Sequence, residues 1–81
     1  MEEKTTDQSV LQRINELVDL EHRMLASETK SEEEQGRLRA LQVELDQCWD
    51  LLRQRRALRT VGQDADQAQV RPPEIVEKYE Q

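Results

Sequence analysis

The sequence is poor in the residues from which large cores and covalent cross-links are built. Its 81 residues include no phenylalanine, one tryptophan, one tyrosine and a single cysteine. One cysteine cannot form a disulfide within the chain, so a reducing compartment is the simpler assumption. Hydrophobic residues make up 35% and charged residues 37% of the chain. This composition is typical of long solvated helices in one small domain.

Long apolar runs and a targeting segment are also missing. No stretch approaches the roughly 18 apolar residues of a membrane span. The N-terminal residues MEEKTTDQ have neither the charge pattern nor the apolar segment of a signal peptide. We therefore expect a cytoplasmic protein without membrane contact. The net charge of −6 argues against general nucleic-acid binding, which draws most of its affinity from neutralised phosphates.

The chain does contain two apolar rows with helical spacing. The second row repeats in unbroken three- and four-residue steps and the first row does so with one gap, as in helices that pack like a coiled coil. The rows are Leu11, Ile14, Val18 and Leu25, flanked by Val10, Leu17 and Met24, and then Leu38, Leu41, Leu45, Cys48 and Leu52. We predict an all-α fold with helices over residues 8–26 and 32–60. The short polar loop between them forces an antiparallel hairpin.

Capping residues and breaks mark the limits of this hairpin, which we place at residues 7–61. Residues 1–6 are expected to form a disordered leader, in which Thr6 can cap the first helix, as can Asp7 just after it. Ser31 and Glu34 have the spacing of a capping box at the start of the second helix.

Residues 62–81 are predicted to form a linker and a tail. The segment QDADQAQ after Gly62 has no apolar period. Arg71 precedes two prolines, which restrict it to extended conformations. A short helix over residues 74–80 would place Ile75 and Tyr79 one turn apart.

A single hairpin leaves part of the second helix uncovered. Trp49, Leu51 and Leu58 lie beside the main apolar row and would be exposed in a monomer. A second copy would bury them at the interface of a homodimeric four-helix bundle. Alternatively, the tail folds back and covers Trp49 with Ile75, Val76 and Tyr79. The two arrangements are compatible with each other.

Residues able to support chemistry are few and scattered. His22 and Cys48 are the soft metal ligands, but they lie far apart in the hairpin, and a zinc site needs three or four converging ligands. We therefore expect no metal and no cofactor. Glu21 occupies an apolar register position, where Arg37 is its expected partner. Because no nucleophile or cofactor motif accompanies Glu21, we do not expect an enzyme.

The one basic patch comprises Arg53, Arg55, Arg56 and Arg59. It lies in a segment, residues 35–60, whose net charge is +3 between segments of −6 and −3. An alternative function is therefore an accessory factor that contacts RNA or an acidic partner through these arginines. The patch lacks the interleaved aromatic residues of many nucleic-acid sites. Our leading hypothesis is a module for protein–protein interaction or dimerisation, whose further protein partner is unknown.

The end of the apolar row decides how the last arginines pair. In the antiparallel register Asp7 faces Leu52, so Arg55 and Arg59 continue the row beyond the end of the first helix. We expect these two arginines to pair within the chain, at the ~0–1 kcal/mol typical of exposed ion pairs. The expected partners are acids such as Asp7, Asp64 and Asp66.

Three strings of the sequence carry a resemblance to a known family. They are RINELVDLEHRML (13–25), ELDQCWDLLRQRRA (44–57) and VRPPEIVEKYEQ (70–81). The chain resembles, from Ser9 onward, a family of short actinobacterial proteins called domain of unknown function 2630. The resemblance implies a small, cytosolic, helical bacterial protein. It implies no activity and no site residues, because the family has none assigned.

Overall fold

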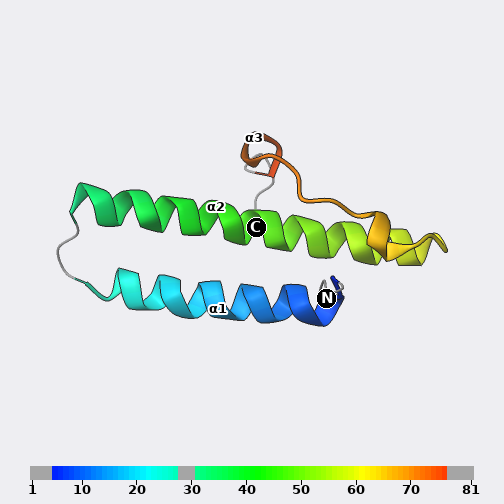
Figure 1. Ribbon diagram of the computed structural model, residues 1–81, viewed down its shortest axis with the longest axis horizontal. Helices are drawn as coiled ribbons and strands as arrows, with labels where there is room; N and C mark the ends of the chain where they lie inside the picture. Colours follow the sequence, from blue (N-terminus) through cyan, green and yellow to red (C-terminus); the bar gives the residue numbers. More distant parts are fainter. Residues whose placement is uncertain (1–4, 28–30, 77–81) are drawn as a thin grey trace, which may run out of the picture.

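The computed structural model describes residues 5–27 and 31–76, in which two long helices pack side by side (Figure 1). The elements of this part of the chain are all helical: α1 (Asp7–Leu25), α2 (Glu32–Thr60), the 3₁₀ turn η1 (Ala65–Gln67) and α3 (Pro73–Val76). Both predicted long helices are confirmed, as is their antiparallel arrangement. Their observed ends lie within one residue of the predicted ones.

Side-chain caps fix where each long helix begins. Thr6 Oγ1 accepts a hydrogen bond from the Ser9 amide at 3.0 Å, and Ser9 Oγ accepts one from the Thr6 amide at 2.9 Å. These reciprocal bonds form a capping box and satisfy two amides that have no partner within the helix. At α2, Ser31 Oγ accepts from the Glu34 amide at 3.1 Å, which confirms Ser31 as the cap. The Glu34 carboxylate accepts from the Ser31 hydroxyl at 3.3 Å, so the reciprocal bond of the predicted capping box is replaced by a bond between the two side chains.

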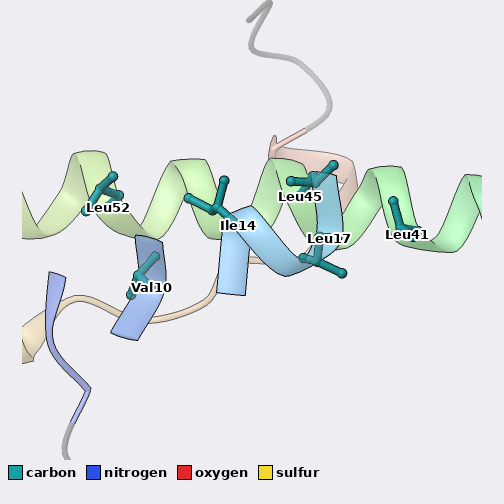
Figure 2. Close-up of a cluster of buried hydrophobic side chains, with 6 residues drawn as sticks. All are labelled: Val10, Ile14, Leu17, Leu41, Leu45 and Leu52. Atoms are coloured by element: carbon teal, nitrogen blue, oxygen red, sulfur yellow. The ribbon is translucent and has the colours of Figure 1, made fainter. Parts of the chain in front are cut away.

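The core lies between α1 and α2 (Figure 2). Its buried side chains are Val10, Ile14 and Leu17 from α1 and Leu41, Leu45 and Leu52 from α2. The predicted row on α1 is displaced, because Leu11 and Val18 lie only half-buried at the edge and Leu25 is exposed. A seven-residue step falls about 20° short of two helical turns, so this row drifts away from α2 along the helix.

The segment after α2 returns along the side of α2 that lies away from α1 (Figure 1). The chain turns at Gly62, whose φ of +77° is a left-handed conformation that glycine adopts readily. Both η1 and α3 then contact α2. We call residues 63–76 the strap.

The strap contains more local structure than the sequence predicts. The Asp64 carboxylate accepts from the Asp66 amide at 2.9 Å and so caps η1, and Ala65 is buried beneath it. Burial of one alanine leaves no periodic signal, so the predicted linker does not show this turn. α3 begins at Pro73, close to the start of the predicted short helix. The rest of that helix, including Tyr79, lies outside the described residues.

Candidate functional site

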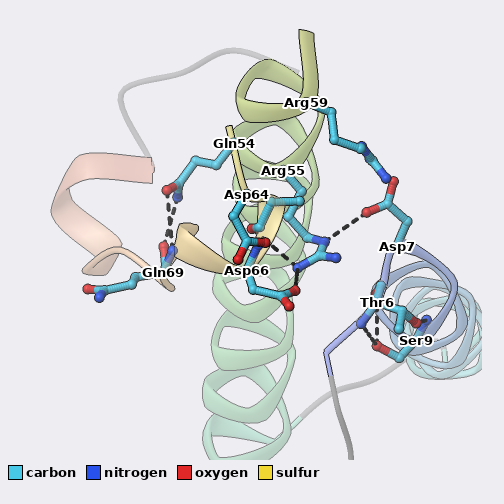
Figure 3. Close-up of polar contacts among 10 residues, drawn as sticks. Thr6, Asp7, Ser9, Gln54, Arg55, Arg59, Asp64, Asp66 and Gln69 are labelled. Carbon is cyan, nitrogen blue, oxygen red and sulfur yellow. Dashed lines mark hydrogen bonds and ion pairs between the residues drawn. The ribbon is translucent and has the colours of Figure 1, made fainter. Parts of the chain in front are cut away.

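The arginine cluster at the end of α2 separates into a buried and an exposed part. Arg55 is only 6% exposed. Its Nε donates to Asp7 at 2.8 Å, while its Nη1 donates to Asp66 at 3.0 Å and to the Ala65 carbonyl at 3.3 Å (Figure 3). Arg59 binds the second oxygen of Asp7. This network joins the start of α1 to α2 and the strap.

The network confirms one prediction. The Asp7 carboxylate pairs with Arg55 and Arg59, which lie about one and two helical turns beyond Leu52 on α2. The expected pairing of the two arginines within the chain is confirmed, with Asp7 and Asp66 as partners. Hydrogen bonds from Arg59 and then Arg55 hold the pKa of Asp7 below its ordinary value. The bond to Asp7 likewise raises the pKa of Arg55.

Glu21 and Arg37, which were expected to form an ion pair, each have a different partner. Glu21 accepts from Gln42 Nε2 at 3.2 Å, whereas Arg37 pairs with Glu33 at 2.9 Å. The expected pair of Glu21 and Arg37 is therefore wrong. Glu33 lies one turn before Arg37 on the same face of α2, and this local partner is reached without crossing to α1.

The two candidate metal ligands lie in separate environments. His22 is exposed on α1, and Cys48 is half-buried against the core. Burial raises the pKa of the Cys48 thiol. Within residues 5–27 and 31–76, no group of three or more His, Cys, Asp or Glu side chains is placed to hold a metal ion.

Trp49 lies at a shallow groove of about 470 Å³ between α1 and α2. The groove is lined by Val18, Glu21, Gln42, Leu45, Asp46 and Trp49. Trp49 keeps 37% of its surface exposed. Burial raises the pKa of Asp46, the charge of Arg53 opposes this effect, and the charge of Glu21 adds to it. A half-buried carboxylate thus stands beside a partly exposed indole.

The other two predicted interface residues face the strap. Leu51 is half-buried and lines two hollows together with Val70. Leu58 is half-buried in a hollow shared with Val61 and Gln67. Leu51 follows Trp49 by two residues, a rotation of about 200° around a helix. The structure therefore does not bring Trp49 together with Leu51 and Leu58.

Polar residues of both signs extend from Trp49 along one flank of α2. Three- and four-residue steps place them on the same side of the helix, where Asp46 comes one turn before Trp49 and Arg53 one turn after it. We call this set the Trp49 row: Gln42, Asp46, Trp49, Arg53 and Arg56. Arg53 and Arg56 are exposed, so these two members of the arginine cluster belong to a different surface from Arg55.

A larger groove of about 770 Å³ lies near the loop between the long helices. Its apolar lining includes Leu17, Leu20, Met24, Ala40 and Leu41. At its rim, Arg13 Nε and Glu44 Oε2 form an ion pair of 2.7 Å that bridges α1 and α2. Leu20 belongs to neither of the two apolar rows in the sequence, so the helical spacing of apolar residues does not predict this groove.

The buried acid Asp50, which lies beneath the strap, is also not predicted by the sequence. Asp50 is 1% exposed and accepts hydrogen bonds from Gln54 at 2.8 Å and from Arg71 at 2.8 Å. A second bond joins Arg71 Nη2 to the other oxygen of Asp50. These bonds, that of Arg71 foremost, hold the pKa of Asp50 below its ordinary value. No short sequence pattern links residues this far apart.

Comparisons with known proteins give a family but no activity. The family described as "Protein of unknown function (DUF2630)" matches residues 6–81. Uncharacterized proteins of Mycobacterium tuberculosis (strain H37Rv) and Mycobacterium bovis are each 48% identical over 81 residues, covering 94% of this chain and 92% of theirs. No solved structure matches. Across the described residues, none of the helices combines the length and apolar character needed to cross a membrane.

Proposed function

We propose that this chain, which belongs to the DUF2630 family of unknown function, is a helical module that forms a homodimer through the Trp49 row. Its relatives are uncharacterized and pass on no activity. The proposal therefore comes from the surface of the chain itself. The proposed role is binding without catalysis, in the cytoplasm, where the thiol of Cys48 stays reduced.

The observation that carries this proposal is the order of charges around Trp49. A two-fold dimer brings the same surface of both copies together, so that surface must complement itself. If two α2 helices meet antiparallel with Trp49 at the axis, Asp46 of each copy lies beside Arg53 of the other. The Trp49 row therefore matches its own copy in both charge and spacing.

The environment of Asp46 supports this pairing. Asp46 is half-buried, and this burial raises the pKa of its carboxylate. A guanidinium group from a second copy would compensate the carboxylate by a charge-assisted hydrogen bond. The indole of Trp49 would lose its exposed surface in the same contact, and tryptophan is common among residues that dominate binding energy.

The size of the core is a second argument for a dimer. The core within α1 and α2 is formed by six buried side chains, which is small for an independent domain of this length. A second hairpin packed on the Trp49 flank would turn two helices into a four-helix bundle. The edge residues Leu11 and Val18 flank the core and would gain cover in that bundle.

Charge reversal tests the proposal without removing the tryptophan. Asp46→Arg and Arg53→Asp each set like charges against each other across the two-fold axis, whereas the double variant restores opposite charges. We expect each single variant to weaken the dimer at least tenfold in sedimentation equilibrium and the double variant to recover it. Arg23→Asp makes the same charge change on the exposed side of α1 and should leave the dimer intact. Single variants that dimerise like the native chain would contradict the proposal.

A further inference from the structure

Two glutamines of α2 bind the backbone of the strap. Gln54 donates from Nε2 to the Gln69 carbonyl at 2.8 Å and accepts at Oε1 from the Gln69 amide at 3.4 Å (Figure 3). Gln47 donates from Nε2 to the Arg71 carbonyl at 3.1 Å. In each of these bonds the strap contributes a main-chain group and α2 contributes a glutamine side chain. They recognise an extended backbone whatever side chains it carries.

One side chain of the strap supplies a charge that α2 requires. Asp50 is an almost fully buried carboxylate, and Arg71 binds both of its oxygens in the forked geometry that suits a guanidinium group. Removing this cation would leave a buried anion without a counter-charge, which is strongly unfavourable. The Arg71 side chain remains 38% exposed, so the cation reaches Asp50 from the surface.

From residue 69 onward, few other side chains of the strap are buried. Val76, five residues after the arginine, is fully buried. Val70 and Ile75 are exposed although both are apolar. Earlier in the strap Ala65 is buried and Asp66 pairs with Arg55, but between residues 69 and 76 α2 contacts the strap mainly through its backbone, Arg71 and Val76.

We propose that the face of α2 formed by Gln47, Asp50 and Gln54 is a binding site for an extended segment of another protein. The segment would carry an arginine and, five residues later, an aliphatic side chain. The strap shows the geometry of the bound ligand and occupies the site until such a segment displaces it. This site is separate from the proposed dimer contact, because Asp50 follows Trp49 by about 100° around α2.

The remaining architecture favours exchange of the strap for a basic ligand. The six-residue cluster between the long helices comes from α1 and α2 alone, so the hairpin keeps this cluster when the strap leaves, while the burial of Ala65 and Val76 is lost. The chain has a net charge of −6, which steers positively charged segments toward it. Charge complementarity therefore selects an arginine-bearing partner over an acidic one.

The test uses a fluorescein-labelled peptide with the sequence of residues 67–81 and the full-length chain. In Arg71→Ala the strap loses its anchor, so the peptide should bind this variant at least tenfold more tightly than the native chain. A peptide with alanine at the arginine position, and the double variant Asp50→Asn/Arg71→Ala, should each lose at least tenfold in fluorescence anisotropy titrations. Arg71→Lys keeps the charge but loses the fork, and it serves if Arg71→Ala does not fold. Arg23→Ala is the matched control and should bind like the native chain.

Two results would overturn the proposal. One is a folded Arg71→Ala or Arg71→Lys chain that does not bind the peptide, or binds it equally well when Asp50 is also replaced by asparagine. The other is native self-association that Asp50→Asn abolishes and reversal at Asp46 does not. That result would identify the strap of a second copy as the occupant. A native chain that does not dimerise would contradict the proposed function but not this inference, because the dimer test changes Asp46 and Arg53 whereas the peptide test changes Asp50 and Arg71.

Discussion

The replacement of Arg55 by alanine offers a direct test of how the two helices and the strap are joined. Arg55 donates to Asp7, Asp66 and the Ala65 carbonyl, and its side chain is almost fully buried. The substitution removes all three hydrogen bonds at once. It also leaves the Ala65 carbonyl without this donor at a buried position.

The magnitude follows from the exposure of the groups left behind. An unsatisfied buried carbonyl costs about 1–3 kcal/mol, and breaking a fully buried ion pair costs about 3–5 kcal/mol. The side chains of Asp7 and Asp66 are 26% and 39% exposed, so water can reach both carboxylates in the variant. The loss typical of a fully buried pair is therefore not reached, and we expect Arg55→Ala to lower the free energy of unfolding by about 2–3 kcal/mol, between the two ranges.

Arg59 provides the contrast, because half of its side chain is exposed. Arg59→Ala should cost the ~0–1 kcal/mol of a surface ion pair, which the sequence alone predicts for both arginines. Urea unfolding followed by circular dichroism, at one fixed protein concentration, measures both values. Arg39→Ala, at an exposed position of the same helix outside the Trp49 row, is the control and should change stability little. Equal losses for Arg55→Ala and Arg59→Ala would refute the reasoning.

Three further predictions concern the cap, two ion-paired acids and the indole. Ser31→Ala should cost ~1 kcal/mol through loss of the bond to the Glu34 amide, and an unchanged urea midpoint would show that α2 does not depend on this cap. The pKa values of Asp7 and Asp50 are lowered from 3.8 on folding, so their stabilisation is complete above that pH and is lost as the pH falls through the folded values. Acid unfolding followed by circular dichroism should therefore be shallower for Asp50→Asn, and identical acid limbs would contradict this. Trp49→Ala should weaken the dimer by ~2 kcal/mol or more in sedimentation equilibrium. Val61→Ala is the control, because Val61 is a more exposed apolar residue outside the Trp49 row, and it should leave the dimer unchanged.

The helices and their ends were predictable because each has a local cause. Three- and four-residue apolar spacing defines α1 and α2, and the hydroxyl groups of Thr6 and Ser31 cap them. The apolar row ends where arginines begin, which also predicted that Arg55 and Arg59 find acids within the chain. Each of these signals depends on residues within a few turns of one helix.

The strap was harder to predict because its contacts join residues that are distant in sequence. In the sequence, Asp50 has the pattern of a solvated acid on a helix. Only the structure shows that Arg71 of the strap covers it and binds both of its oxygens. The order of charges around Trp49 was present in the sequence. The apolar register separates Arg55 and Arg59 from the other arginines of the patch, but only the structure shows that Arg55 is buried while Arg53 is exposed beside Trp49.

The most direct test of the account is the mass of the native chain in solution. Light scattering after size exclusion, over a range of micromolar concentrations, should give about twice the 9.6 kDa of one chain. The same measurement should give one chain mass for Asp46→Arg and two for Asp46→Arg/Arg53→Asp. A native chain that stays monomeric throughout this range and unfolds cooperatively would contradict a dimer formed through the Trp49 row.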